Sequence, residues 1–149
     1  MIINIAGHDV LIDNEDYERV RDIDWHLSDR RYFRKCKRKG KKVTVIWLHK
    51  FILDAKEADV VDHKNGNTFD NRKINLRLCT TNQNAQNRKR FSNNKSGYKG
   101  VSFDKGRWRA YININGKRIH LGHYGTREEA YDAYCEASAK YHGEFGRVV

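Results

Sequence analysis

Cysteine is scarce in this sequence of 149 residues. The three cysteines, Cys36, Cys79 and Cys135, lie far apart, and no Cys-x-x-Cys pair occurs. That spacing argues against a disulfide scaffold and a cysteine-rich structural zinc site. Long apolar runs are also missing: no stretch reaches the length of a membrane span, and the N-terminus lacks the basic and apolar segments of a signal peptide. We therefore expect a soluble, cytoplasmic chain with reduced thiols and no membrane partner.

Acidic residues are few in the middle of the chain. The formal net charge is +11, and Arg30 to Gly97 holds 19 of the 30 basic residues but only 5 of the 19 acidic ones. A run of charges is usually just a solvated face, but so concentrated a positive block favours a polyanionic partner. Hydrophobic residues make up 38% of the sequence, enough for one ordinary domain or two small ones.

Short strands and turns are expected in the first half. Hydrophobic alternation predicts strands in "IINIAG" and "HDVLID", a helical or turn stretch in "NEDYERVRDIDW", and a hairpin whose turn is the basic "KRKGKK". An apolar strand or short helix should follow from Val43 to Leu53. Next, "VVDH" predicts a strand, "KNGNTFDNRKIN" a loop, and "TTNQNAQNRKR" a helix capped by Thr80 or Thr81.

The pattern changes after "FSNNKSG", which is small and polar and typical of a linker. Three alternating strands should follow, joined by turns at Lys105-Gly106 and Asn115-Gly116. Thr126 and Glu129 then form a capping-box pattern that begins a helix. The apolar residues of this helix are predicted to share one face, which should pack on the sheet: Ala130, Ala133, Tyr134, Ala137 and Tyr141.

Asp62 and His63 stand at the end of one predicted strand, ahead of an Asn-rich loop and helix. A histidine can take a proton from water at neutral pH because its ordinary pKa of about 6.5 leaves it largely neutral. A carboxylate and an amide oxygen are hard ligands that suit magnesium. Asn84 and Asn87 are three residues apart, so both can face the same strand. An isolated Asp-His pair is more often structural than catalytic, so residue types alone leave both interpretations open.

Several positions at matching separations extend the pattern. The sequence "LHKFIL…VVDHKNGNTFDNRKINLRLCTTNQNAQN" resembles the His-Asn-His (HNH) endonucleases, the ββα-metal nucleases, in the branch of phage and intron-borne homing enzymes. The resemblance covers Trp47 to Arg88. It implies a nuclease that hydrolyses phosphodiester bonds with one divalent metal, magnesium or manganese. Many relatives have His where the last motif residue is Asn here.

The resemblance also implies a role for each motif residue. His63 corresponds to the general base, and Asp62 and Asn84 to the metal ligands, with Asn87 as the alternative to Asn84. Asn75 corresponds to the middle Asn that braces the loop, with Asn71 as its rival. His49 is expected to be structural, beneath the site. No structural zinc is expected.

Polar and apolar residues alternate along the predicted C-terminal strands. The alternation places the polar residues on one sheet face and Trp108, Ala110, Ile112 and Ile114 on the other. A small twisted sheet with an exposed basic face can enter a DNA major groove, although most exposed sheet faces are merely solvated. The predicted polar face comprises Arg107, Arg109, Tyr111, Asn113, Arg118 and His120.

Gly97 to Gly143 resembles the ethylene-response-factor (APETALA-two type) DNA-binding domain. The shared features are Tyr-basic-Gly-Val, Gly-basic-aromatic, Leu-Gly-x-Tyr-x-Thr-x-Glu-Glu-Ala and a final His-Gly. The plant pattern has Arg where Ser102 and Asn113 stand and Trp where His120 stands, so the plant target sequence does not transfer. By position, the resemblance implies DNA contacts from Lys99, Ser102, Arg107, Arg109, Tyr111, Asn113, Arg118 and His120.

The expected fold is α+β: a ββα-metal nuclease module preceded by short strands and followed by a three-stranded antiparallel sheet packed on one helix. We divide it into a β-rich basic segment (1–43), the nuclease module (44–90), a linker (91–96) and the DNA-binding domain (97–149). Basic side chains outside that domain should hold the DNA backbone. These are Arg34, Lys37, Arg38, Arg88, Lys89 and Arg90.

The expected function is a homing-type endonuclease that nicks or cleaves double-stranded DNA, as a monomer or a DNA-induced dimer, with no small-molecule substrate. One rival is a DNA-binding regulator with a vestigial nuclease module. A second is a nuclease that acts on RNA or as a toxin. Double-stranded RNA is disfavoured because its deep, narrow major groove excludes such a sheet.

Overall fold

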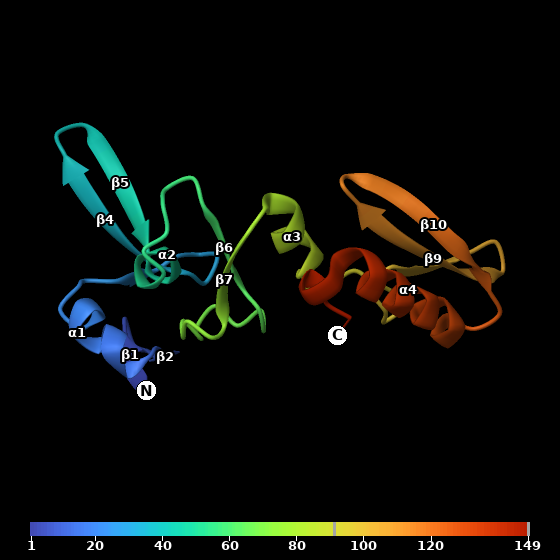
Figure 1. The fold of residues 1–149 in the computed structure, drawn as a ribbon, viewed down its shortest axis with the longest axis horizontal. Helices are drawn as coiled ribbons and strands as arrows, with labels where there is room; N and C mark the ends of the chain where they lie inside the picture. Colours follow the sequence, from blue (N-terminus) through green and yellow to red (C-terminus); the bar gives the residue numbers. More distant parts are fainter. Residues whose placement is uncertain (91, 149) are drawn as a thin grey trace. The chain divides into compact units, whose positions relative to one another are not determined.

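The chain divides into two compact units, Met1–Thr80 and Thr81–Val149. The computed structural model describes residues 1–90 and 92–148, so Phe91, the first residue of the predicted linker, lies outside the described residues. In these residues, the first unit combines three small antiparallel sheets with helices and the second unit one such sheet with helices, which confirms the predicted α+β class (Figure 1). Within the described residues, no helix has both the length and the apolar character to span a membrane.

The first unit begins with two hydrogen-bonded hairpins of different character. Strands β1 and β2 lie where the sequence predicted strands, and they pair antiparallel in the register Ile2↔Leu11. The polar stretch that follows forms a 3-10 turn, η1, and a single helical turn, α1. A second sheet has the order β3-β4-β5, and its long hairpin bears the basic residues. The bounds are β1 Ile2–Ile5, β2 His8–Leu11, η1 Asn14–Asp16, α1 Tyr17–Val20, β3 His26–Leu27, β4 Phe33–Lys39 and β5 Lys42–Trp47.

The apolar stretch from Val43 to Leu53, for which the sequence predicted a strand or a short helix, forms both. Strand β5 runs to Trp47, and the helix α2, Leu48–Ile52, follows at once. Strands β6, Val60–His63, and β7, Leu76–Cys79, then pair antiparallel and enclose the Asn-rich loop. The helix α3 is shorter than predicted, Thr81–Gln86. It belongs to the second unit, so the predicted module 44–90 extends across the boundary between the units.

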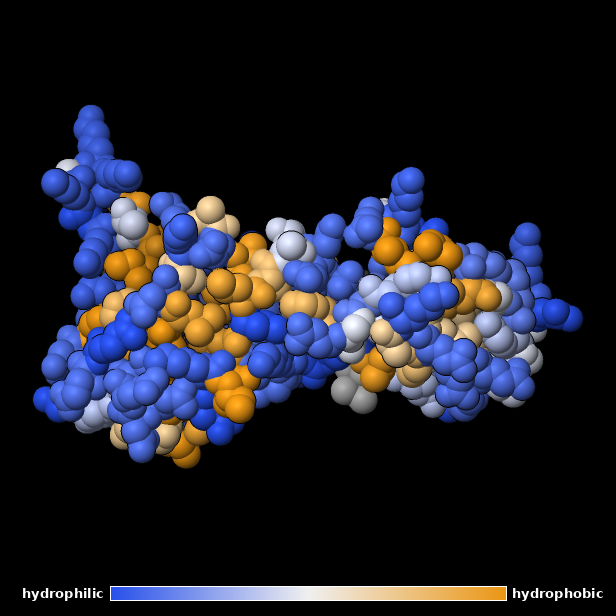
Figure 2. Space-filling view, in the orientation of Figure 1, coloured by the Kyte–Doolittle hydropathy of each residue, from blue (hydrophilic) through white to orange (hydrophobic). Residues whose placement is uncertain are grey.

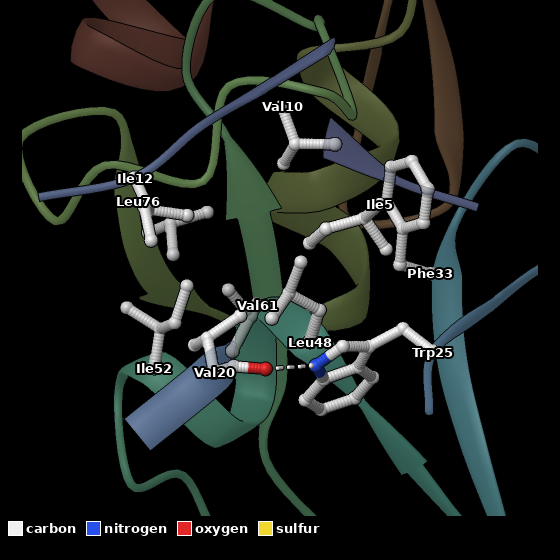
Figure 3. Close-up of a cluster of buried hydrophobic side chains, with 10 residues drawn as sticks. All are labelled: Ile5, Val10, Ile12, Val20, Trp25, Phe33, Leu48, Ile52, Val61 and Leu76. Atoms are coloured by element: carbon white, nitrogen blue, oxygen red, sulfur yellow. Dashed lines mark hydrogen bonds between the residues drawn. The ribbon is translucent and has the colours of Figure 1, made fainter. Parts of the chain in front are cut away.

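One hydrophobic cluster unites the elements of the first unit. It includes Val10 from β2, Phe33 from β4, Leu48 from α2 and Val61 from β6 (Figure 3). The indole of Trp25 also lies in this cluster, where its Nε1 donates to the backbone oxygen of Val20 over 3.1 Å. Burying each such side chain stabilises the fold by roughly 1.5–3 kcal/mol. Val61 anchors β6 in this cluster.

The second unit is a three-stranded antiparallel sheet packed on one helix. The sheet order is β10-β9-β8, and the two predicted turns join its strands. Lys105 and Asn115 have positive φ, as do the glycines after them, which is the backbone of type I′ hairpin turns. The bounds are β8 Val101–Asp104, β9 Arg107–Ile114, β10 Lys117–Tyr124, α4 Arg127–His142 and η2 Gly143–Phe145.

Helix α4 begins with the predicted capping box. The Thr126 hydroxyl accepts from the Glu129 backbone N–H, and the Glu129 carboxylate accepts from the Thr126 backbone N–H. One predicted packing residue is wrong: Tyr141 is 47% exposed. The buried stripe instead follows the i, i+4 row from Tyr134 through Ser138 to His142, because the contact line drifts around the helix toward its end.

Candidate functional site

His63 ends strand β6, and its imidazole is buried and contacts the Asn71 side-chain amide. Its Nε2 lies 3.3 Å from Asn71 Oδ1. The Asn71 amide is oriented by its own Nδ2, which donates to the Thr68 backbone oxygen over 3.1 Å. Because an amide oxygen can only accept, the proton of a neutral His63 ring lies on Nε2, and Nδ1 becomes the proton-accepting nitrogen.

The electrostatic surroundings of His63 favour its neutral form. Burial lowers its pKa, and this effect is opposed by the Asn71 hydrogen bond and by the charges of Asp62 and Asp70. Desolvation penalises the charged imidazolium more than these partners favour it. The ring therefore remains able to accept a proton near neutral pH.

Asp62 is buried beside His63 and paired with an arginine that the sequence analysis did not single out. The register of β6 and β7 places Arg77 directly opposite Asp62. Its Nε and Nη2 both donate to Asp62 Oδ2, over 3.0 and 2.8 Å. The only signal in the sequence was the position of Arg77 two residues after Asn75. The ion pair compensates the buried carboxylate and fixes its orientation.

The Asn-rich loop between β6 and β7 is closed by the Asn75 side chain. Its Nδ2 donates to the Asp70 backbone oxygen over 2.7 Å, and its Oδ1 accepts from the Asn65 backbone N–H over 3.0 Å. The Asp70 carboxylate receives the Arg72 guanidinium through two bonds of 2.8 Å, which lowers the pKa of Asp70. The two rival residues thus have different contacts: Asn71 touches His63, and Asn75 joins the ends of the loop.

His49 lies in a cluster of rings next to His63. The ring centroids of His49 and His63 are 5.3 Å apart, and Tyr32 lies 5.3 Å from His49 and 5.9 Å from His63. The rings of Trp47 and His49 are stacked, with their centroids 6.2 Å apart. Burial, followed by the charges of His63 and Lys50, lowers the pKa of His49 to about 3. His49 is therefore neutral at physiological pH.

The two helix asparagines have different environments within the second unit. Asn84 lies inside α3 and is partly exposed, whereas Asn87 follows the helix, is buried, and donates its backbone N–H to the Gln83 oxygen over 3.2 Å. Asp62, by contrast, lies in the first unit. The choice of Asn84 as metal ligand stays a prediction from the motif.

Asp62 offers a buried carboxylate in the first unit, and carboxylate oxygens are among the ligands that magnesium prefers. Across residues 1–90 and 92–148, no group of three or more His, Cys, Asp or Glu side chains could hold a metal ion. A magnesium site with few protein ligands keeps several waters and suits substrate phosphate oxygens.

The predicted backbone-binding residues lie on two separate basic segments. Strand alternation puts Arg34 and Arg38 on one face of the β4–β5 hairpin and Lys37 on the other. The tip of this hairpin is strongly hydrophilic in Figure 2. The second segment, 88–90, follows α3 in the other unit and is exposed.

The outer face of the C-terminal sheet carries the predicted polar residues. The register sets Ser102 opposite Arg109 and Asn113 opposite Arg118. The Arg118 guanidinium lies over the Tyr111 ring, 4.4 Å from its centroid. This contact partly orders a long basic side chain on the exposed sheet before any partner binds.

A β-bulge in β10 adds a histidine that the sequence analysis missed. The register shifts between His120 and Gly122, so that His120 pairs with Tyr111 and His123 pairs with Arg109. Both histidines therefore share the outer face, with ring centroids 4.6 Å apart. Simple alternation would have put residues three apart on opposite faces.

Lys99 differs from the other residues predicted to contact DNA. Its ammonium donates to two backbone oxygens, that of Gln86 over 2.5 Å and that of Arg147 over 3.2 Å. Burial, and then the charge of Arg147, lowers the pKa of Lys99 to about 8. The structure thus shows its charge engaged within the second unit.

Comparison with known proteins gives matches over both parts of the chain. Residues 56–86 match the HNH endonuclease family, and residues 96–144 match the AP2 domain. Protein 3.8 of Escherichia phage T7 is 33% identical over 89 residues, which cover 58% of this chain and 73% of that protein. The HNH homing endonuclease I-HmuI, solved in a study of DNA binding and cleavage, aligns at 22% identity with a TM-score of 0.36.

The alignment with I-HmuI covers 77% of this chain and 66%, just under two thirds, of that enzyme. The two matched families are those that the sequence motifs resembled, so both resemblances are confirmed. The HNH match contains the Asp62-His63 pair and Asn84, and the AP2 match contains the whole C-terminal sheet. The chain therefore belongs to the HNH endonuclease family, the DNA-cleaving hydrolases, and carries an AP2 domain that binds DNA.

Proposed function

We propose that this chain is a metal-dependent, homing-type endonuclease that nicks or cleaves duplex DNA at sites selected by its AP2 domain. The observation that carries the proposal is the pair at the end of β6. Asp62 and His63 are both buried there, the carboxylate is fixed by Arg77, and the imidazole is fixed by Asn71. A pair held so firmly supports a catalytic role, because preorganised groups need little rearrangement to reach the reactive geometry.

His63 acts as the general base. Its Nε2 proton is held by Asn71, and its Nδ1 takes a proton from the attacking water. The water then attacks the phosphorus, and the bond to the 3′ oxygen breaks. Asn75 keeps the loop closed around this histidine through the Asp70 and Asn65 backbone groups. His49 supports the imidazole from the side by ring contact.

Asp62 and Asn84 would hold the divalent metal, with magnesium the first choice and manganese a substitute. When bound, the metal supplies positive charge for the non-bridging and leaving oxygens of the phosphate. Arg77 keeps the Asp62 carboxylate in one orientation and lowers the cost of burying its charge. One such site cuts one strand at a time, so double-strand cleavage needs a second protomer or a second visit.

The outer face of the AP2 sheet reads the DNA. Arg107, Arg118 and Asn113 are exposed there, and arginine is the commonest reader of guanine edges in a major groove. Arg109, Tyr111, Ser102 and His120 contribute shape and phosphate contacts. The hairpin residues Arg34, Lys37 and Arg38 and the segment 88–90 hold the backbone, which makes the affinity depend on salt. The phage relative supports action in the cytoplasm of a bacterial host.

A supercoiled-plasmid assay tests the proposal. The purified chain is incubated with magnesium, manganese or chelator, next to the His63→Ala variant and the control His26→Ala. His26 is an exposed histidine in the same unit, remote from the β6 site in sequence. We expect nicked circles that require metal and His63, with unchanged binding to duplex DNA in both variants. If His63→Ala nicks the plasmid as fast as the unmodified chain, His63 is not the general base. If the plasmid is not nicked at all, because it lacks the target site, the same assay is repeated on a library of random DNA targets.

A further inference from the structure

The helix that carries the candidate metal ligand has almost no apolar anchor of its own. Its sequence is "TNQNAQ", and none of its six residues is buried. A single turn or two of helix is unstable in water without tertiary contacts. Helix α3 lies beside η2, the turn that follows α4 in the same unit (Figure 1). Polar contacts must therefore supply much of its attachment.

Lys99 provides such a contact at the C-terminal end of α3. Its Nζ donates over 2.5 Å to the oxygen of Gln86, the last residue of the helix. Carbonyl groups in the last turn have no partner within the helix, and the negative end of the helix dipole favours a cation there. The same Nζ reaches the oxygen of Arg147 over 3.2 Å. One side chain thus joins α3, the segment before β8, and the C-terminal segment.

Two close approaches of the backbone explain why Lys99 sits there. Gly100 has a φ of +74°, and a Cβ at this position would lie 2.1 Å from the Tyr134 ring. Its oxygen accepts from the Tyr111 backbone N–H over 2.8 Å, which fixes the chain at the edge of β9. At Gly146, a Cβ would lie 2.4 Å from Ser138 Oγ, so the segment before Arg147 runs tight against α4.

The ammonium is costly to place at this position. Desolvation lowers the pKa of Lys99, and an exposed lysine would bind a DNA phosphate without that penalty. Two charge-assisted hydrogen bonds to carbonyl oxygens offset the cost. A groove of about 410 Å³ separates α3 from β9 and is lined by Gln86, Lys99 and Tyr111. The helix therefore does not pack flat on the sheet at this point, and the lysine side chain reaches the end of α3 beside this groove.

We propose that Lys99 is a positioning residue that fastens α3, and with it Asn84, to the AP2 domain. Both contacts of Lys99 lie within the second unit, so the side chain keeps α3 and Asn84 in one place in that unit. The consequence for catalysis rests on the proposed function, because it requires Asn84 to bind the metal.

The experiment compares Lys99→Met with Lys99→Arg and the control Lys95→Met in the full chain. Methionine keeps an unbranched stem without the donor, arginine restores charge and donors, and Lys95 is an exposed lysine four residues earlier. Circular dichroism establishes that each variant is folded. Hydrogen exchange of the 81–88 peptide then reports the attachment of α3 directly. Nicking is titrated with magnesium, and duplex DNA binding is measured without metal.

We expect Lys99→Met to raise exchange in 81–88 at least tenfold and to raise the magnesium concentration for half-maximal nicking at least fivefold. Its DNA affinity should fall no more than that of Lys95→Met, and Lys99→Arg should restore both readouts. The proposal that Lys99 fastens α3 is wrong if hydrogen exchange in 81–88 is unchanged in Lys99→Met. It is also wrong if this segment shows no protection from exchange in the unmodified chain. A selective loss of DNA affinity with an unchanged magnesium titration overturns it in favour of a phosphate contact. If the unmodified chain does not nick DNA, the proposed function fails, and the exchange result still decides the role of Lys99.

Discussion

His49 should make the first unit sensitive to acid. Its pKa is about 3 in the folded chain, against an ordinary value of 6.5 that applies once the chain unfolds. Between these two values the unfolded state binds one proton more than the folded state, so a falling pH favours unfolding. At about pH 5 this one residue lowers the free energy of unfolding by about 2 kcal/mol relative to about pH 7.5.

The perturbation is His49→Phe, which keeps a ring between Trp47 and His63 but cannot take a proton. Urea denaturation followed by tryptophan fluorescence measures the free energy of unfolding at both pH values. A Trp108→Phe background restricts the signal to the first unit, which holds Trp25 and Trp47.

The unmodified His49 chain should lose about 2 kcal/mol more than His49→Phe over this pH range. Some acid sensitivity remains in the variant, because the pKa of His63 is also lowered by burial. The difference between the two chains, and not the total slope, is therefore the measured quantity. Equal losses in both would refute the assignment of His49 as a buried neutral imidazole.

Two further predictions concern the site and the reader. Arg77→Met should remove the guanidinium that pairs with the buried Asp62 carboxylate, which costs about 3–5 kcal/mol in urea denaturation and raises the magnesium concentration needed for nicking, because Asp62 loses its fixed orientation; an unchanged stability would show that the pair contributes little. Arg118→Ala should cost about 1–3 kcal/mol of binding and relax the preference at one base pair, since Arg118 lies ordered over Tyr111 on the outer sheet face. Lys117→Ala is its matched control, and an identical target preference in both variants would contradict base reading by Arg118.

Local signals in the sequence determined a large part of this fold. The turns at Lys105-Gly106 and Asn115-Gly116 and the capping box of Thr126 and Glu129 occur where they were predicted. Each depends on residues within four positions, whose backbone preferences act before any tertiary contact forms. The strand ending in Asp62 and His63 was equally local, since an apolar pair leads into a turn-rich loop.

Contacts between distant residues were decided only by the tertiary structure. The Arg77 partner of Asp62 depends on the register of two strands, and the shared face of His120 and His123 depends on a bulge that simple alternation cannot reveal. The carbonyl contacts of Lys99 depend on chain segments 13 and 48 residues away. The sequence by itself determined most of the elements, the families and the reactive residue types, because these follow from short-range preferences and motif spacing. Tertiary structure decided which charges are paired and buried, because the cost of desolvation depends on neighbours that only folding brings together.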